Sequence, residues 1–258
     1  MADDYELFKS QILMLTKIDL NAYKEGQMRR RIDTLIAKHG CPTYAKYVEL
    51  IKSNPERFEE FVNYLTINVS EFWRNPDQWK ILEEKVVPEL IKSPSMKIWS
   101  AACSTGDEPY SLVMLLSKYV PLSRIKIIAT DIDKQVLAKA RSGMYSDKSI
   151  KGLPDEFKTK FFEKISDTAF QIVPEVKNCV EFREHNLLRD PYPNMCDLIV
   201  CRNVLIYFTD EAKDEIYLKY NSSLKPGGIL FLGSTEQIIQ PGQYGFKAIS
   251  SFFYRKEN

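Results

Sequence analysis

The sequence has few of the residues on which metal sites and nucleophilic enzymes depend. Its 258 residues include two histidines and five cysteines, and no two cysteines have the Cys-x-x-Cys spacing of a zinc or redox site. Scattered cysteines in odd number also argue against a disulfide framework of the kind that exported proteins use. We therefore expect no bound metal, no Ser-His-Asp or Cys-His catalysis, reduced thiols and a cytoplasmic location.

A charge excess of one sign and long apolar runs are missing as well. The net charge of +1 gives no overall attraction to nucleic acid or to an anionic membrane. No apolar run approaches the ~18 residues that a membrane span requires, and the N-terminal residues lack a basic segment followed by an apolar one. We expect a protein that is not exported, does not insert into membranes and does not bind nucleic acid.

The first third of the chain has strong helical periodicity. Apolar residues between Tyr44 and Ile51 recur at positions i, i+3, i+4 and i+7, and the same spacing returns after Pro55. This pattern predicts an N-terminal all-α domain over residues 1–75. A linker helix at 76–94 is expected to follow it.

One predicted helix of this domain carries a basic stripe. Lys24, Arg31 and Lys38 are spaced seven residues apart, and Arg30 adds charge beside them. The stripe is either a solvated helix face or a docking surface for an acidic helical partner. A docking stripe would mainly raise the association rate, and its effect would decrease with salt.

A strand, a tight loop and a helix are expected between Met96 and Leu112. Small residues around Gly106 would let a ligand approach the backbone, and the N–H groups at the helix start favour partial negative charge. Asp107 and Glu108 make this loop a poor cradle for phosphate but a good one for a cation or for ribose hydroxyls. S-adenosylmethionine combines a ribose, an ammonium and a sulfonium, although an ordinary strand-to-helix turn also explains the pattern.

Strands and helices alternate from Met96 onwards, which predicts a parallel sheet with crossover helices. The second strand ends in Asp131 and Asp133, where acids are well placed for ribose hydroxyls. Capping of the following helix explains Asp133 equally well. The alternation breaks at about 143–180, where we expect a small inserted antiparallel β subdomain, with a strand over 176–182.

Several motifs in order make the chain resemble the chemotaxis receptor methyltransferases of the CheR family. The motifs are NVSEFWR at 68–74, WSAACSTGDEPYS at 99–111, ATDID at 129–133, NLL at 186–188 and CRNVLIYF at 201–208. The resemblance spans nearly the whole chain. It implies an α/β fold, with a doubly wound, Rossmann-like class I methyltransferase domain over 95–258. It also implies methyl transfer from S-adenosylmethionine to glutamate side chains of methyl-accepting chemotaxis receptors.

Position by position, the resemblance implies a set of residues that bind S-adenosylmethionine and the product S-adenosylhomocysteine. They are Asn68, Ser70, Arg74, Glu108, Asp131, Asp133, Asn186, Leu187 and Asn203. Elementary chemistry agrees with several of these roles. Arg74 suits the methionine carboxylate, Glu108 suits the ammonium or sulfonium end, and Asp131 suits the ribose diol. Asn186 and Leu187 would then contact the adenine through a side-chain amide and an apolar surface.

The substrate side follows from the same resemblance. Arg202 and Tyr207 are expected to orient the incoming carboxylate, although an ion pair and an aromatic core explain them equally well. Lys24, Arg30, Arg31 and Lys38 would dock the cytoplasmic helical domain of the receptor. The stretch 164–169 lacks the Gly-x-Gly turn of members that grip a C-terminal pentapeptide tether, so tether binding is not expected.

Two other functions fit parts of the sequence. Asp190-Pro191-Tyr192-Pro193 is similar to the Asp-Pro-Pro-Tyr motif of amino methyltransferases that act on nucleic acid, but it precedes the fourth strand instead of following it. A non-catalytic module that binds the cofactor or a receptor is the second alternative. The presence of Arg74, Glu108 and Asp131 argues against such loss of activity.

Overall fold

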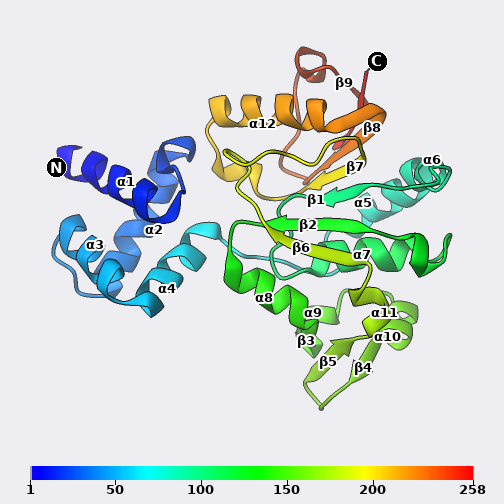
Figure 1. The fold of residues 1–258 in the computed structure, drawn as a ribbon, viewed down its shortest axis with the longest axis horizontal. Helices are drawn as coiled ribbons and strands as arrows, with labels where there is room; N and C mark the ends of the chain where they lie inside the picture. Colours follow the sequence, from blue (N-terminus) through cyan, green and yellow to red (C-terminus); the bar gives the residue numbers. More distant parts are fainter. Residues whose placement is uncertain (1, 258) are drawn as a thin grey trace. The chain divides into compact units, whose positions relative to one another are not determined.

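The computed structural model describes residues 2–257, and the chain divides into two compact units (Figure 1). Unit 1 contains the residues up to Asn68 together with Leu205–Glu215. Unit 2 contains Val69–Val204 and the residues from Ile216 onwards. None of the described helices combines the length and apolar character needed to cross a membrane.

Unit 1 is built from helices, which confirms the predicted all-α domain. Its elements are α1 (Ala2–Thr16), the 3₁₀ turn η1 (Leu20–Ala22), α2 (Glu25–Lys38), α3 (Tyr44–Ser53) and α4 (Pro55–Thr66). The Thr43 hydroxyl accepts a hydrogen bond from Lys46 N at the start of α3, and the Asn54 side chain accepts one from Arg57 N at the start of α4. The aromatic rings of Phe8, Tyr47 and Phe61 are fully buried in its core.

A late segment of the chain completes unit 1. The 3₁₀ turn η4 (Leu205–Tyr207) and the start of α12 (Asp210–Ser223) belong to it. Lys24 N donates to Tyr207 O at 2.9 Å, and Thr209 N donates to Ala22 O at 2.8 Å. The rings of Tyr23 and Phe208 lie 4.7 Å apart. The sequence pattern did not predict that residues 205–215 belong to the N-terminal unit.

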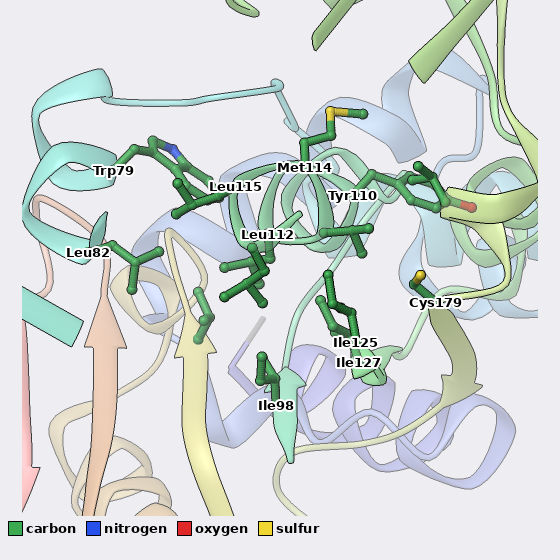
Figure 2. Close-up of a cluster of buried hydrophobic side chains, with 14 of the residues drawn as sticks. Trp79, Leu82, Ile98, Tyr110, Leu112, Met114, Leu115, Ile125, Ile127 and Cys179 are labelled. Carbon is green, nitrogen blue, oxygen red and sulfur yellow. The ribbon is translucent and has the colours of Figure 1, made fainter. Parts of the chain in front are cut away.

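Unit 2 begins with a helix that packs into its core. The helix runs as α5 (Pro76–Ile81), a π-helical turn η2 (Leu82–Val86) and α6 (Val87–Leu90). Pro88 has no N–H for an ordinary i→i−4 bond, and Val87 N donates to Leu82 O across the wider turn. Trp79 and Leu82 point from this helix into the apolar cluster shown in Figure 2.

The centre of unit 2 is a seven-stranded sheet in the order β6-β2-β1-β7-β8-β10-β9. Its strands are β1 (Ile98–Ser100), β2 (Ile127–Asp131), β6 (Val180–Glu184), β7 (Cys196–Cys201), β8 (Leu224–Leu232), β9 (Phe246–Ser250) and β10 (Phe253–Lys256). Neighbours from β6 to β8 pair in parallel, and β10 pairs antiparallel with β8 and β9. The order reverses at β1, and ligands of open α/β sheets bind at the carboxyl ends of the strands beside such a reversal.

Helices cover both faces of this sheet, as the doubly wound prediction requires. α7 (Asp107–Leu116) and α8 (Lys134–Ser142) follow β1 and β2, and Figure 1 shows α7 and α12 on opposite sides of the sheet. Successive side chains of a strand point to opposite faces. Accordingly, Ile98 lies in the cluster with Leu112 of α7 (Figure 2), while the Trp99 ring lies 5.6 Å from the Tyr220 ring of α12.

The predicted insert forms a separate three-stranded antiparallel sheet in the order β3-β5-β4. It contains β3 (Met144–Ser146), α9 (Asp147–Ile150), α10 (Asp155–Phe161), β4 (Phe162–Lys164) and β5 (Ala169–Ile172). The expected strand over 176–182 is wrong in its first half. Pro174 opens a short helix, α11 (Pro174–Lys177), and β6 begins only at Val180.

Candidate cofactor site

The loop after β1 is closely packed around one glycine. Gly106 has φ of +90°, and a Cβ on it would lie 2.9 Å from Ala140 Cβ and 3.0 Å from the Tyr145 hydroxyl oxygen. Cys103 N donates to Thr130 O at 2.9 Å, which ties the loop to the end of β2. Only glycine fits this position without strain, so the tight turn expected at the switch point is present.

The two acids that follow Gly106 have different environments. Burial raises the pKa of Asp107, and hydrogen bonds from the hydroxyls of Thr105 and Ser70 oppose that shift. Burial also raises the pKa of Glu108, which the positive charge of Arg202 opposes. Ser70 therefore lies beside the first turn of α7. Asp107 is held within the protein.

Glu108 and Arg202 form a buried ion pair at the ends of β1 and β7. Ser100 Oγ donates to Glu108 Oε1 at 2.8 Å, and Arg202 Nη1 lies 3.6 Å from Glu108 Oε2. Exposed fractions of the two side chains are 3% for Arg202 and 12% for Glu108. Desolvation lowers the pKa of Arg202, and the neighbouring Glu108 charge counteracts it.

Arg202 also fastens the segment around Arg74. Its Nη2 donates to Arg74 O at 2.6 Å, to Asn75 Oδ1 at 3.2 Å and to Gln78 Oε1 at 2.8 Å. Arg202 therefore links two candidate cofactor residues, Arg74 and Glu108, that are far apart in sequence. Because these protein groups engage both ends of the guanidinium, its geometry suits a positioning role better than contact with an incoming carboxylate.

Asp131, the last residue of β2, is a buried acid that contacts the β1 loop. Its Oδ2 accepts a hydrogen bond from Ser104 N at 2.8 Å, and its Oδ1 accepts one from Asp133 N at 3.0 Å. Burial raises the pKa of Asp131 to about 6, against the lowering effect of these backbone donors. Asp133 caps α8 by accepting from Gln135 N at 2.8 Å. This geometry favours Asp131 over Asp133 as the residue for a ribose.

The next loop, after β6, is joined to the same strand end. His185 N donates to Asp131 O at 2.9 Å. Asn186 Oδ1 accepts from Leu188 N at 2.9 Å and closes a local turn in this loop. Leu187 is buried and stays available as an apolar wall.

Asn203, after β7, depends on an acid that sequence reasoning missed. Glu236 Oε2 accepts hydrogen bonds from Asn203 N at 2.7 Å and from Gly233 N at 2.8 Å. Asn203 has φ of +61°. A Cβ on Gly233 would lie 2.5 Å from Glu236 Oε2, which explains the glycine. Glu236 follows β8, and no recognised motif marks it in the sequence.

Two buried polar atoms at this sheet edge support a polar ligand. Among residues 2–257, Ser104 Oγ and Asn203 Oδ1 have no hydrogen-bond partner. An unsatisfied buried polar group costs about 1–3 kcal/mol. A ribose and an amino acid end would supply partners for such atoms, so the residues present fit S-adenosylmethionine.

Other expected site residues lie in unit 1. Asn68 Nδ2 donates to Thr66 Oγ1 at 2.8 Å, and Tyr207 contributes its carbonyl to the contact with Lys24. In the basic stripe, Arg31 donates to Tyr64 O at 2.5 Å, and Lys38 pairs with Glu60 at 2.7 Å. Lys24 and Arg30 are exposed.

Two family descriptions match successive parts of the chain. The description "CheR methyltransferase, all-alpha domain" matches residues 3–66, and "CheR methyltransferase, SAM binding domain" matches residues 68–252. A "Chemotaxis protein methyltransferase" of Listeria innocua is 40% identical over 98% of this chain and 97% of its own length.

More distant proteins were also found. "Chemotaxis protein methyltransferase 1" of Pseudomonas aeruginosa is 34% identical over 91% of this chain and 90% of its own length. A solved TehB-like SAM-dependent methyltransferase from Corynebacterium glutamicum aligns with a TM-score of 0.42 and 13% identity, covering 80% of this chain and 100% of that one.

Proposed function

The chain belongs to the CheR methyltransferase family and is an S-adenosylmethionine-dependent methyltransferase of chemotaxis, and we propose that its substrates are glutamate side chains of chemoreceptors. The products would be glutamate methyl esters and S-adenosylhomocysteine. The observation that carries this proposal is the Arg202 network, which fastens the Arg74 segment and Glu108 to one edge of the sheet.

The bound cofactor supplies an activated methyl group on a sulfonium. A glutamate side chain has an ordinary pKa near 4.3, so it is ionised at neutral pH and needs no general base. The protein therefore has to hold the two reactants in line and exclude water, which contributes far more than a single hydrogen bond. The scarcity of histidine is consistent with this chemistry.

Each binding group has a distinct task in this proposal. Arg74 pairs with the carboxylate of the methionine end, and Glu108 attracts its ammonium. Asp131 accepts hydrogen bonds from the ribose hydroxyls. Ser104 Oγ and Asn203 Oδ1 form hydrogen bonds with other polar groups of the ribose and the amino acid end. Tyr207 stays the candidate for orienting the incoming carboxylate. Arg202 acts through Arg74 and Glu108.

We further propose that unit 1 docks the cytoplasmic helical domain of the receptor through α2. Lys24, at the N-cap of α2, and Arg30 are exposed, and in the described part of the chain no side-chain partner engages Arg30. Arg31 and Lys38 contact α4, so they support the helix more than they offer free charge. An acidic helical surface is the complementary partner.

Transfer of label tests the proposed substrate. Radiolabelled methyl from S-adenosylmethionine should pass to purified receptor cytoplasmic fragments, and alkali should release it, because methyl esters of glutamate hydrolyse readily. Glu108→Gln serves as the matched loss-of-function variant. RNA is offered as a second methyl acceptor in the same assay. Transfer of label to RNA, or to neither RNA nor the receptor fragments, would contradict the receptor assignment.

A further inference from the structure

Glu236 is a buried acid outside the set of residues assigned to the cofactor. The residue is 5% exposed, and its Oε2 accepts hydrogen bonds from Asn203 N at 2.7 Å and from Gly233 N at 2.8 Å. N–H donors of this kind favour the ionised form of a carboxyl group. Glu236 therefore places a negative charge inside unit 2, where β7 and β8 end.

The Glu236 carboxylate lies beside a side chain that is available to a ligand. Asn203 Oδ1 is buried, and among residues 2–257 it has no hydrogen-bond partner. A Cβ on Gly233 would lie 2.5 Å from Glu236 Oε2 and 3.1 Å from Asn203 Nδ2, so the acid and the asparagine are closely packed at this glycine. The charge of Glu236 thus lies next to the candidate cofactor site.

This charge also acts on the buried ion pair of the site. Burial raises the pKa of Glu108 and lowers that of Arg202, and the negative charge of Glu236 raises both. Water and salt screen the interactions of buried charges only weakly. A charge that acts on Glu108 and Arg202 will act on a cofactor bound beside them as well.

The cofactor and its product differ by one unit of charge. S-adenosylmethionine carries a sulfonium in addition to its ammonium and carboxylate, whereas S-adenosylhomocysteine has a neutral thioether in place of the sulfonium. The adenosine and the amino acid end are the same in both molecules. A fixed negative charge near the sulfur therefore stabilises the bound cofactor and has little effect on the bound product.

We propose that Glu236 is a specificity-determining residue whose charge raises the affinity of the site for S-adenosylmethionine relative to S-adenosylhomocysteine. The inference rests on the proposed cofactor site and does not depend on the identity of the methyl acceptor. Without this charge, the product would compete more strongly with the cofactor for the site.

Glu236→Gln tests the charge while keeping the shape of the side chain. Its amide oxygen can accept hydrogen bonds from Asn203 N and Gly233 N in place of Oε2, so the two loops stay joined. Calorimetric titration without a methyl acceptor measures the affinity of each ligand. Thermal unfolding shows that each variant is folded.

Glu236→Gln should weaken S-adenosylmethionine binding about tenfold and S-adenosylhomocysteine binding less than about twofold. Tenfold corresponds to about 1.4 kcal/mol, the energy of two unit charges about 12 Å apart at an effective dielectric constant of about 20. Sinefungin, which has a protonated amine at the position of the methyl sulfonium, should lose affinity as S-adenosylmethionine does.

Two variants serve as controls. Glu236→Asp keeps the charge but shortens the side chain, so it should change the affinities for cofactor and product by the same factor. Glu89→Gln removes the charge of an exposed acid that pairs with Arg255 at 2.8 Å, and neither affinity should change.

The ratio of the two affinities decides the outcome. Equal weakening of both ligands by Glu236→Gln would assign the residue a purely structural role and overturn the inference. An unchanged ratio with unchanged binding would overturn it too, as would a ratio that falls in Glu236→Asp as far as in Glu236→Gln. If the unaltered protein bound neither ligand, the cofactor assignment itself would fail, and the inference with it.

Discussion

Asp131 is a carboxylate whose surroundings set a pH dependence. Its pKa of about 6 in the folded protein lies above the ordinary value near 3.9, so the folded state keeps a proton that the unfolded state loses first. The stabilising contribution is therefore complete below about pH 4 and is lost as the pH rises through 6. An ionised carboxylate is the better acceptor for ribose hydroxyls.

We expect S-adenosylhomocysteine affinity to fall as the pH is lowered through 6, approaching tenfold per pH unit as Asp131 must release its proton. Asp131→Asn should bind about tenfold more weakly at neutral pH and lose this pH dependence. Calorimetric titration between pH 5 and 8 measures both effects. An unchanged pH profile in the variant would exclude Asp131 as the titrating group.

Arg202→Lys keeps the positive charge of this side chain but removes the planar guanidinium that makes several hydrogen bonds at once. A lysine cannot reach Arg74 O, Gln78 Oε1 and Glu108 together, so Arg202→Lys should lower the free energy of unfolding by about 2–4 kcal/mol and weaken cofactor binding. Urea unfolding with and without S-adenosylhomocysteine measures the two effects.

Arg255→Lys is the control for Arg202→Lys. Arg255 pairs with Glu89 at 2.8 and 3.0 Å at the surface of unit 2. Surface pairs are worth about 1 kcal/mol or less, so this variant should keep near-normal stability and affinity. Equal losses in the two variants would contradict the special role of Arg202.

At the scale of elements, the turn from β1 into α7 is the most constrained connection of the site. Gly106→Ala should cost about 2–4 kcal/mol, because the left-handed backbone is strained for alanine and its Cβ meets Ala140. Gly26→Ala in α2 is the control, since a Cβ there meets nothing within 4 Å. Thermal unfolding separates them, and equal melting temperatures would refute the packing argument.

Sequence periodicity predicted most elements because each had a local signature. α7 shows apolar helical spacing, and β2 is a mostly apolar run that ends in Asp131. α11 was missed because Val176 and the residues after it look strand-like, although Pro174 favours a helix start. The sequence could not predict that Glu236 accepts a hydrogen bond from Asn203 N or that Lys219 donates one to Leu188 O. Only the tertiary fold brings these loop atoms near the two side chains.

At the scale of the whole molecule, we expect receptor docking to depend on the exposed positive charge of unit 1. Arg30→Glu should raise the KM for receptor fragments roughly threefold to tenfold at low salt, with a smaller effect at high salt, because exposed charges act mainly on association. Cofactor affinity should not change. Arg31→Glu is less informative, since the loss of its contact with Tyr64 would also disturb α4.

Lys52→Glu makes the same charge change at an exposed position of α3 and serves as the control. Methylation assays at two salt concentrations, with the receptor fragment varied, distinguish the two surfaces. Equal KM values for the Arg30 and Lys52 variants would place the docking surface away from α2.

The return of residues 205–215 to unit 1 has a practical consequence for anyone who divides this protein. A fragment cut after Asn68 would leave Lys24 N and Ala22 O without the partners that Tyr207 and Thr209 provide. Such a fragment should be poorly soluble by itself, and a synthetic peptide of the missing segment, added in trans, should rescue it. Unit 1 is one compact body, but two separate stretches of the sequence form it, so a single cut cannot release it intact.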